Sequence, residues 1–349
     1  MSRIAAVHGV LAPHRYAQRE ITEQVAAVCR GGRVDRRLLH RLHAHAGVRH
    51  RHTALPLHEY GRLRDFGAVN DVFIATAVRL GAEAVRGALR RAGLSPRDVD
   101  LLVFTSVTGI AVPSVDARLV GRLGLRPDVK RIPMFGLGCA AGTARLHDYL
   151  AGRPDQVAVL LCVELCSLTF QWEDDSPANL VASGLFGDGA AALVMCGAAR
   201  RDGADGPCVV DARSRLYPDT ERALGWDVTA SGFRVVLDAA VPDLVRAHLA
   251  EQVDDLLDAH GLKRQDVAAW VCHPGGPKVL DAVAEALELP PGSLDVAWRS
   301  LAAVGNLSSA SVLHVLRDTL RLRRPTPGTP GLLLAMGPGF GSELVLLRW

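Results

Sequence analysis

The two halves of the sequence repeat one pattern of a turn followed by an apolar run. Gly93-Leu94 closes a stretch with helical spacing of its apolar residues, and Asp98-Val99 then opens a continuous apolar run. Gly261-Leu262 and Asp266-Val267 repeat this arrangement after 168 residues (261 − 93). Continuous apolar runs that alternate with helices are typical of buried parallel strands. The sequence therefore predicts an α/β layered fold that is duplicated about a pseudo-two-fold axis.

Composition and charge argue against several classes of partner. The chain has 349 residues, 49% of them hydrophobic, so it can bury a large core. Its formal net charge of +3 favours neither a nucleic acid nor an anionic membrane. The apolar run at residues 4–11 is too short to span a bilayer, and no signal-peptide pattern follows it. The seven cysteines are scattered and without zinc-finger spacing, which predicts a reduced, cytoplasmic protein.

One cysteine, Cys139, lies among small residues between a predicted strand at 131–135 and a predicted helix at 145–150. Its small neighbours are Gly136, Gly138, Ala140, Ala141 and Gly142. Near a helix N-terminus, unpaired N–H groups and the helix dipole favour the thiolate and lower the pKa of the thiol. Taken alone, a cysteine of this kind is more often a buried structural residue. Its role therefore depends on partners elsewhere in the chain.

Two further residues supply such partners. The repeat shift places Cys139 opposite position 307 (139 + 168), beside Asn306, in a small-residue turn that opens a predicted helix at 311–321. His273 ends the second buried strand. Alone, the histidine is more often a satisfied core residue and the asparagine a helix cap. Together with Cys139 they form a nucleophile, a base and an amide, which suit attack on a thioester and stabilisation of an enolate or oxyanion.

Three of these segments resemble the signatures of type III polyketide synthases, the chalcone and stilbene synthase family. They are Gly-Cys-Ala-Ala-Gly at 138–142, His-Pro-Gly-Gly-Pro at 273–277 and Gly-Asn-Leu-Ser-Ser-Ala at 305–310. Their order and spacing match the family, and residues 185–191 and 337–339 match further family motifs. The resemblance runs along nearly the whole chain.

The resemblance implies a thiolase-like α/β/α/β/α fold, a homodimer, and neither a metal nor another cofactor. It implies an N-terminal half at 1–199 with the nucleophile and a C-terminal half at 209–349 with the histidine and asparagine. Cys139 would take an acyl group from an acyl-CoA starter and extend it by decarboxylative condensation with malonyl-CoA or an alkylmalonyl-CoA before cyclisation. His273 and Asn306 would stabilise the enolate that remains when carbon dioxide leaves.

The resemblance also implies the residues that bind the substrate. Phe186 matches the phenylalanine that separates the CoA tunnel from the cavity. Arg41 and His45 match basic positions that contact CoA phosphates, and we add Lys278 to that patch. The predicted substrate-binding set is Val107, Cys166, Thr169, Phe186, Val235, Ser308, Gly337, Pro338 and Gly339.

Three of these positions depart from the plant pattern. Val235 stands where a second gate phenylalanine is usual, and Val107 and Cys166 replace threonines, whereas Thr169 and Ser308 are kept. These changes predict a more apolar cavity, an aliphatic acyl starter and a pyrone or resorcinol product. A cysteine at the position of Val107 is typical of bacterial tetrahydroxynaphthalene synthases, so Val107 argues against that product.

Three other classes of protein share part of the pattern. A ketoacyl-ACP synthase III has the same Cys-His-Asn set, but it condenses once and normally has His-Gln-Ala-Asn where this chain has residues 273–276. A catalytically silent partner subunit would usually lack one of the three residues. A cysteine protease has a tryptophan or tyrosine directly after the nucleophile, where this chain has Ala140.

Overall fold

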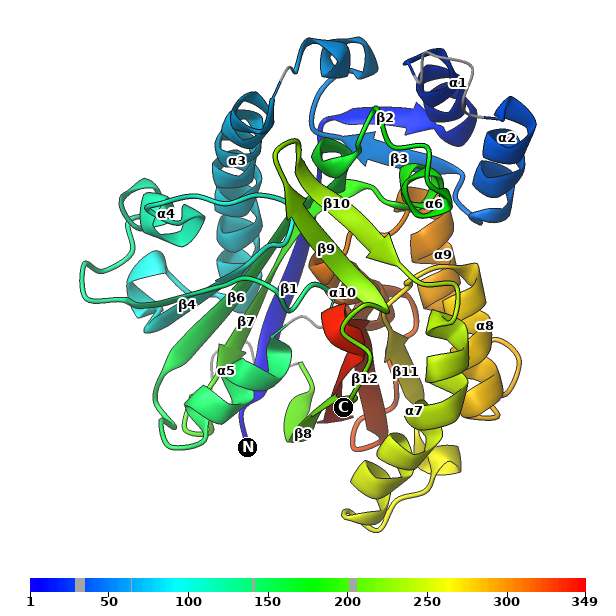
Figure 1. Ribbon diagram of the computed structural model, residues 1–349. Coiled ribbons are helices and arrows are strands. Elements are labelled where there is room, and N and C mark those ends of the chain that lie inside the picture. The colour runs from blue at the N-terminus through cyan, green and yellow to red at the C-terminus, as the bar shows by residue number, and fades with distance from the viewer. Residues whose placement is uncertain (29–34, 64, 140–141, 201–205) are drawn as a thin grey trace.

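The computed structural model describes residues 1–28, 35–63, 65–139, 142–200 and 206–349, and within them nine strands form one mixed sheet (Figure 1). In order across the sheet the strands are β11 (Ala269–Cys272), β12 (Pro330–Gly337), β13 (Gly341–Arg348), β8 (Cys208–Leu216), β1 (Arg3–Leu11), β7 (Asp188–Cys196), β6 (Val157–Leu165), β4 (Leu101–Thr105) and β5 (Lys130–Met134). Ala140 and Ala141 of the cysteine motif lie outside the described residues.

The sheet is built from two equivalent halves, as the repeat in the sequence predicts. β8, β13, β12 and β11 follow one another on one side with the same pairing directions as β1, β7, β6 and β4 on the other: antiparallel, antiparallel, parallel. The halves meet at β1 and β8, which are joined at the pair Arg3 and Cys208. The pseudo-two-fold axis therefore passes between these two strands.

The two halves of the sheet are the two β layers of the predicted α/β/α/β/α fold, and helices form the other three layers. The main ones are α3 (Phe66–Ala92), α4 (Val115–Leu123), α5 (Thr143–Leu150), α7 (Val241–Asp258), α8 (Pro277–Ala286) and α10 (Ser309–Leu322). α5 contacts β6 and β7 of one half and β8 and β13 of the other, and α10 contacts β1, β6 and β7 as well as β11 and β12. These two helices therefore form the central layer. α3 and α4 cover the first half of the sheet, and α7 and α8 pack together on the second.

Local chemistry explains why both halves turn in the same way. Gly93 ends α3 and Gly261 follows α7, each in the left-handed conformation that glycine adopts without strain, with φ of 71° and 67°. In the next turn, the Asp98 carboxylate accepts from Ser95 N at 2.8 Å and that of Asp266 accepts from Lys263 N at 2.7 Å. The repeated glycine and aspartate are thus the stop signal and the cap of one turn used twice.

Most of the elements outside the repeat lie in the upper half of Figure 1. They are β2 (His14–Ala17), α1 (Gln18–Val28), α2 (Arg36–His45), β3 (His50–Thr53), α6 (Pro177–Leu185), α9 (Asp295–Val304), the hairpin β9 (Leu224–Thr229) and β10 (Gly232–Leu237), and the short 3-10 helices η1 (Leu57–Arg62), η3 (Cys166–Thr169) and η5 (Pro338–Phe340). Two further 3-10 helices, η2 (Pro96–Asp98) and η4 (Arg264–Asp266), are the repeated turns themselves. Among the described residues, no helix is both long and apolar enough to cross a membrane.

Candidate active site

Cys139 lies in the turn between β5 and α5, packed against the loop that follows β12. Gly138 has φ of 50°, and a Cβ atom there would overlap the ring of Pro338. Glycine is therefore needed both for the backbone conformation and for the close approach. The Cys139 thiol is buried and donates a hydrogen bond to Ser308 Oγ at 3.6 Å. This contact brings the nucleophile of the first half onto the asparagine loop of the second.

The ionisation of Cys139 differs from the prediction. Burial raises the pKa of this thiol to about 12, and the hydrogen bond with Ser308 offsets only part of that effect. Burial likewise lowers the pKa of His273 to about 3. α5 begins at Thr143, four positions after the cysteine, and a helix dipole acts mainly within its first turn. The predicted low pKa is therefore wrong for the protein without substrate: the thiol and the imidazole are both neutral.

His273 and Asn306 lie on adjacent loops that contact each other. His273 follows β11, where its backbone N–H donates to Leu334 O at 2.9 Å. Asn306 Nδ2 donates to Gly275 O at 3.2 Å, and its Oδ1 accepts from Ser308 N at 2.8 Å. The His273 Nδ1 atom is buried without a hydrogen-bond partner among the described residues. Hydrogen bonds thus run from Cys139 through Ser308 and Asn306 to the loop that carries His273.

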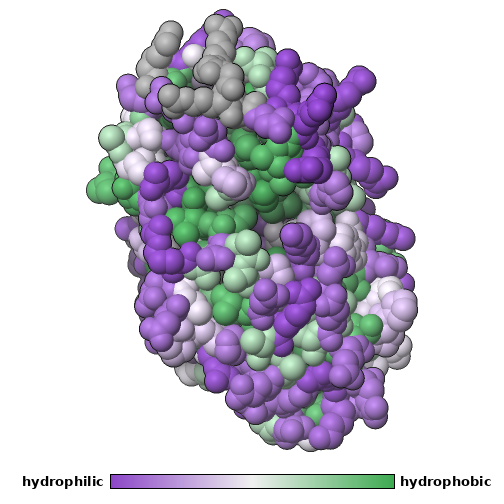
Figure 2. All heavy atoms as spheres, turned by 45° about the vertical axis from the view of Figure 1, so that its right-hand side comes forward, coloured by the Kyte–Doolittle hydropathy of each residue, from purple (hydrophilic) through white to green (hydrophobic). Residues whose placement is uncertain are grey.

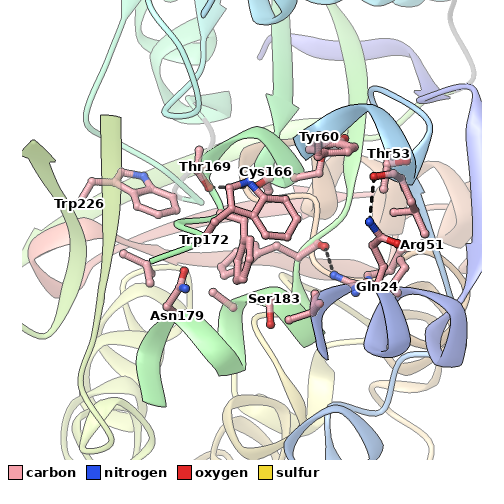
Figure 3. Close-up of a pocket in the computed structure, with 18 residues that line it drawn as sticks. Gln24, Arg51, Thr53, Tyr60, Cys166, Thr169, Trp172, Asn179, Ser183 and Trp226 are labelled. Carbon is pink, nitrogen blue, oxygen red and sulfur yellow. Dashed lines mark hydrogen bonds between the residues drawn. The ribbon is translucent and has the colours of Figure 1, made fainter. Parts of the chain in front are cut away.

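The predicted substrate cavity is divided into two chambers. Chamber A has a volume of about 60 Å³ and includes Cys166, Thr169, Phe186 and Val235 in its walls. Figure 3 shows it between β9, which contributes Trp226, the segment with Trp172, and α1, which contributes Gln24. Chamber B has a volume of about 210 Å³ and includes Val107, Pro338 and Gly339 in its walls. Gly337 ends β12 next to chamber B. The structure thus places these residues around two spaces rather than the single cavity that the sequence predicts.

Trp226, which the sequence reasoning missed, lines both chambers. It is the cross-strand partner of Val235 in the β9–β10 hairpin. Side chains of cross-strand partners lie on the same face of a hairpin, so the indole occupies space that the small valine leaves. The expected opening of the cavity at Val235 is therefore partly filled. The pairing register of the hairpin would have placed Trp226 opposite Val235, but the sequence analysis did not assign that register.

Glu164 is a second residue that sequence reasoning missed. Its carboxyl group is fully buried and accepts hydrogen bonds from Ser309 Oγ at 2.5 Å, Thr108 Oγ1 at 3.0 Å, Val107 N at 3.1 Å, and Ser106 Oγ and Ser308 Oγ at 3.3 Å. Burial raises the pKa of this carboxyl, and the hydrogen bonds from Ser309, Val107, Thr108 and Ser308 oppose that shift. Glu164 ties the wall of chamber B to the loop beside Cys139. It is the one charged residue in an otherwise apolar predicted strand, which was its signal.

The three residues predicted to bind CoA phosphates are exposed. Arg41 and His45 lie on α2 and Lys278 at the start of α8. The two helices approach each other where Gly47 lies against the ring of Pro277. Residues 41–52 form a stretch rich in arginine and histidine. His43 and Arg51, from this stretch, are instead buried, and burial lowers the pKa of His43 to about 3. One part of this stretch therefore lies on the surface, and another part lies in the core. Among the described residues, no group of three His, Cys, Asp or Glu side chains is placed to hold a metal ion.

Comparison with known proteins shows the family of the chain. Residues 10–199 match the N-terminal domain and residues 209–349 the C-terminal domain of chalcone and stilbene synthases. A 1,3,6,8-tetrahydroxynaphthalene synthase from Streptomyces peucetius subsp. caesius is 60% identical over 99% of this chain and 93% of its own length. A putative chalcone synthase from Bacillus subtilis (strain 168) is 38% identical over 84% of each protein.

Solved structures give the same answer. The crystal structure of 1,3,6,8-tetrahydroxynaphthalene synthase from Streptomyces coelicolor A3(2), described as a bacterial type III polyketide synthase, superposes with a TM-score of 0.92 at 31% identity over 99% of both chains. A polyketide synthase from the brown alga Ectocarpus siliculosus has a TM-score of 0.92 at 28% identity, over 99% of this chain and 98% of its own. The chain therefore belongs to the chalcone and stilbene synthase family. It is a type III polyketide synthase, an enzyme of the acyltransferase class.

Proposed function

We propose that Cys139 carries the growing chain and that His273 and Asn306 serve its extension. The Cys139 sulfur loses its proton and attacks the carbonyl of an acyl-CoA starter, and the CoA thiolate leaves. Malonyl-CoA, or an alkylmalonyl-CoA, then loses carbon dioxide, and its enolate carbon attacks the acyl carbonyl on sulfur. A carbon–carbon bond forms and the cysteine sulfur is released. The observation that carries this proposal is the unbroken set of contacts from Cys139 through Ser308 and Asn306 to the His273 loop.

Because Cys139 and His273 are both neutral, the first step has to include transfer of the thiol proton. Cys139 has a raised pKa and His273 a lowered one, so the thiol proton must move to the imidazole as the sulfur attacks. The imidazolium and the Asn306 amide then stand as donors beside the enolate oxygen that forms after decarboxylation. Both carbonyl groups are supplied as CoA thioesters, so the scheme calls for no further cofactor.

A CoA thioester matches the surface near the chambers. Arg41, His45 and Lys278 offer positive or titratable groups for the phosphates. Figure 2 shows hydrophobic residues gathered in a hollow in the upper half of the face, with hydrophilic residues around it. An acyl chain and a charged carrier need such a combination of surfaces.

A second copy of the chain is the proposed partner. β5 lies at the edge of the sheet, where its outward N–H and C=O groups are available to another strand. Large apolar side chains are exposed on and near it: Ile132 at 44%, Phe135 at 53%, Ile110 at 47% and Val112 at 97%. Such a patch beside an edge strand is typical of an interface between subunits. Sedimentation of the purified protein should show a dimer, and Ile132→Asp should give a monomer.

The starter and product have two candidates, each with its own support. The apolar walls of chamber A favour an aliphatic starter, which leads to a pyrone or resorcinol. The 60% identity with a tetrahydroxynaphthalene synthase favours that phenolic product, against the expectation drawn from Val107.

Mass spectrometry of products tests both candidates. The purified protein is given malonyl-CoA alone and malonyl-CoA with a panel of acyl-CoAs. Tetrahydroxynaphthalene from malonyl-CoA alone would decide for the second candidate, and acyl-dependent pyrones or resorcinols for the first. A single condensation product in every reaction would point to a ketoacyl synthase, and no product with any substrate would point to a silent subunit.

A further inference from the structure

The loop that carries Asn306 is fixed against a second loop from the first half. Asn306 N donates to Leu185 O and Gly187 N donates to Asn306 O, each at 2.9 Å. A Cβ atom on Gly187 would lie 2.5 Å from Val304 O, and one on Gly305 would lie 2.7 Å from Leu185 O. Two glycines thus allow the backbones to touch. The position of the Asn306 amide therefore depends on where the segment 184–187 is held.

A buried arginine holds that segment. Arg51, on β3, is 4% exposed, and its Nη1 donates to Phe186 O at 2.8 Å. Its aliphatic carbons also lie against the loop, since a Cβ atom on Gly305 would be 3.3 Å from Arg51 Cγ and Cδ. One side chain thus contacts Phe186 of the Phe186–Asn306 bridge and also Gly305, the residue before Asn306. A single amide or ammonium group could not make both kinds of contact with the same geometry.

Gln18, at the start of α1, holds the arginine in turn. Its Oε1 accepts from Arg51 Nε at 3.0 Å, and its Nε2 donates to Gly184 O at 2.7 Å. Segment 184–186 is therefore held by two side-chain donors, at Gly184 and at Phe186. No carboxylate among the described residues lies within ion-pair distance of Arg51. The buried Asp188 carboxylate acts on Arg51 through space, from beyond ion-pair distance, so burial of this cation is only partly offset and remains costly.

We propose that Arg51 is a positioning residue for Asn306, and that Gln18 sets the position of Arg51. The guanidinium fixes the Phe186 carbonyl and the Gly305 backbone, and through them the direction of the Asn306 amide toward the Cys139 site. The same contact holds Phe186, which lines chamber A. This inference rests on the proposed role of Asn306 in decarboxylation.

The test compares two steps in the same preparation of enzyme: decarboxylation of malonyl-CoA and acylation of Cys139 by an acyl-CoA. Arg51→Ala should lower decarboxylation about 30-fold, the scale of a small misplacement of a reacting group, and acylation by less than about 3-fold. In an Asn306→Ala background, Arg51→Ala should change decarboxylation by less than about 2-fold, because the residue through which it acts is already absent. Thr22→Val, which alters the neighbouring contact with His43, should leave both steps unchanged.

Chemical rescue adds a readout that a general loss of packing would not give. Arg51 lines chamber A, so ethylguanidinium has a route to the space that Arg51→Ala opens. It should restore decarboxylation in that variant, whereas ethylammonium should not. If Arg51→Ala does not fold, Gln18→Met takes its place in the same cycle, with an expected loss of about 5-fold.

Two outcomes would overturn the proposal: equal loss of both steps in Arg51→Ala, or its full effect in the Asn306→Ala background. Failure of the proposed function has a separate signature, since Asn306→Ala alone would then leave decarboxylation intact.

Discussion

The starts of α5 and α10 occupy equivalent places in the two halves but are built in opposite ways. Before α10, Asn306 is fixed by its backbone N–H and C=O and by both ends of its side chain. Before α5, Cys139 has one long hydrogen bond to the part of the chain that the structure describes, to Ser308, and its turn contains two glycines with positive φ, Gly136 and Gly138. α10 is also buried along most of its length, whereas α5 buries one side.

The difference teaches how a duplicated fold separates two tasks. A group that stabilises developing charge must be fixed in place before the reaction, because reorganisation would cost the stabilisation it provides. A nucleophile must instead approach carbon and then release it, which requires a turn with small residues and few bonds. The loop before α10, fixed by several hydrogen bonds, supplies the Asn306 amide. The turn before α5, which has few, supplies the Cys139 sulfur.

Removal of the amide should produce the largest effect. Asn306→Ala should lower decarboxylation of malonyl-CoA by about 10²- to 10³-fold, the scale of one lost oxyanion donor, and acylation of Cys139 by less than about 3-fold. Separate assays with radiolabelled malonyl-CoA and with an acyl-CoA would measure the two steps. Equal losses in both steps, with unchanged thermal unfolding, would show that Asn306 also serves the acylation of Cys139.

Cys139, in the turn before α5, should respond to pH as a neutral thiol. The pKa of Cys139 is raised to about 12, so the thiolate fraction should grow about tenfold for each unit between pH 6 and pH 9. The rate of alkylation by iodoacetamide, with that of Cys139→Ala subtracted, should follow this slope. A plateau that begins near pH 6 would instead reveal a preformed thiolate–imidazolium pair, as the helix-dipole argument predicts.

Chamber A should set the length of the starter through Val235 and Trp226. Each buried methylene contributes about 0.8 kcal/mol, so kcat/KM should rise about 3- to 4-fold per methylene until the chamber is full. Val235→Phe should move that limit to shorter chains, and Trp226→Ala should move it to longer ones by joining the chambers. Assays with acyl-CoAs of increasing length would show it. A limit that neither variant moves would place the acyl chain elsewhere.

The smallest effect should come from the surface. Lys278→Ala should raise KM for CoA substrates about 2- to 5-fold at low salt, and the difference should shrink as salt is added. Lys263→Ala is the matched control, because Lys263 is also exposed but pairs with Asp258 far from α2. An equal change in both variants would remove Lys278 from the proposed CoA surface.

The sequence was sufficient for features that local chemistry decides. Gly93 and Gly261 stop helices because only glycine adopts that backbone conformation without strain, and Asp98 and Asp266 cap the turns that follow. The repeat then placed Asn306 opposite Cys139, since equivalent segments of a duplicated sheet meet at its axis. These predictions needed no knowledge of the packing.

Features that depend on packing were missed or mistaken. The pKa of Cys139 follows from its burial, which exceeds the effect of a helix that begins four residues later. Trp226 divides the cavity only because the hairpin register pairs it with Val235. Glu164 finds its five donors on segments far apart in the sequence. None of these contacts is visible in the spacing of residues along the chain.

The central claim is that Cys139 carries the acyl group, and peptide mass spectrometry tests it most directly. The enzyme is incubated with an acyl-CoA without malonyl-CoA, quenched in acid and digested. We predict one acyl group on the peptide that contains Cys139, and none on any peptide of Cys139→Ala. An acyl group on a different cysteine that persists in Cys139→Ala would contradict the account.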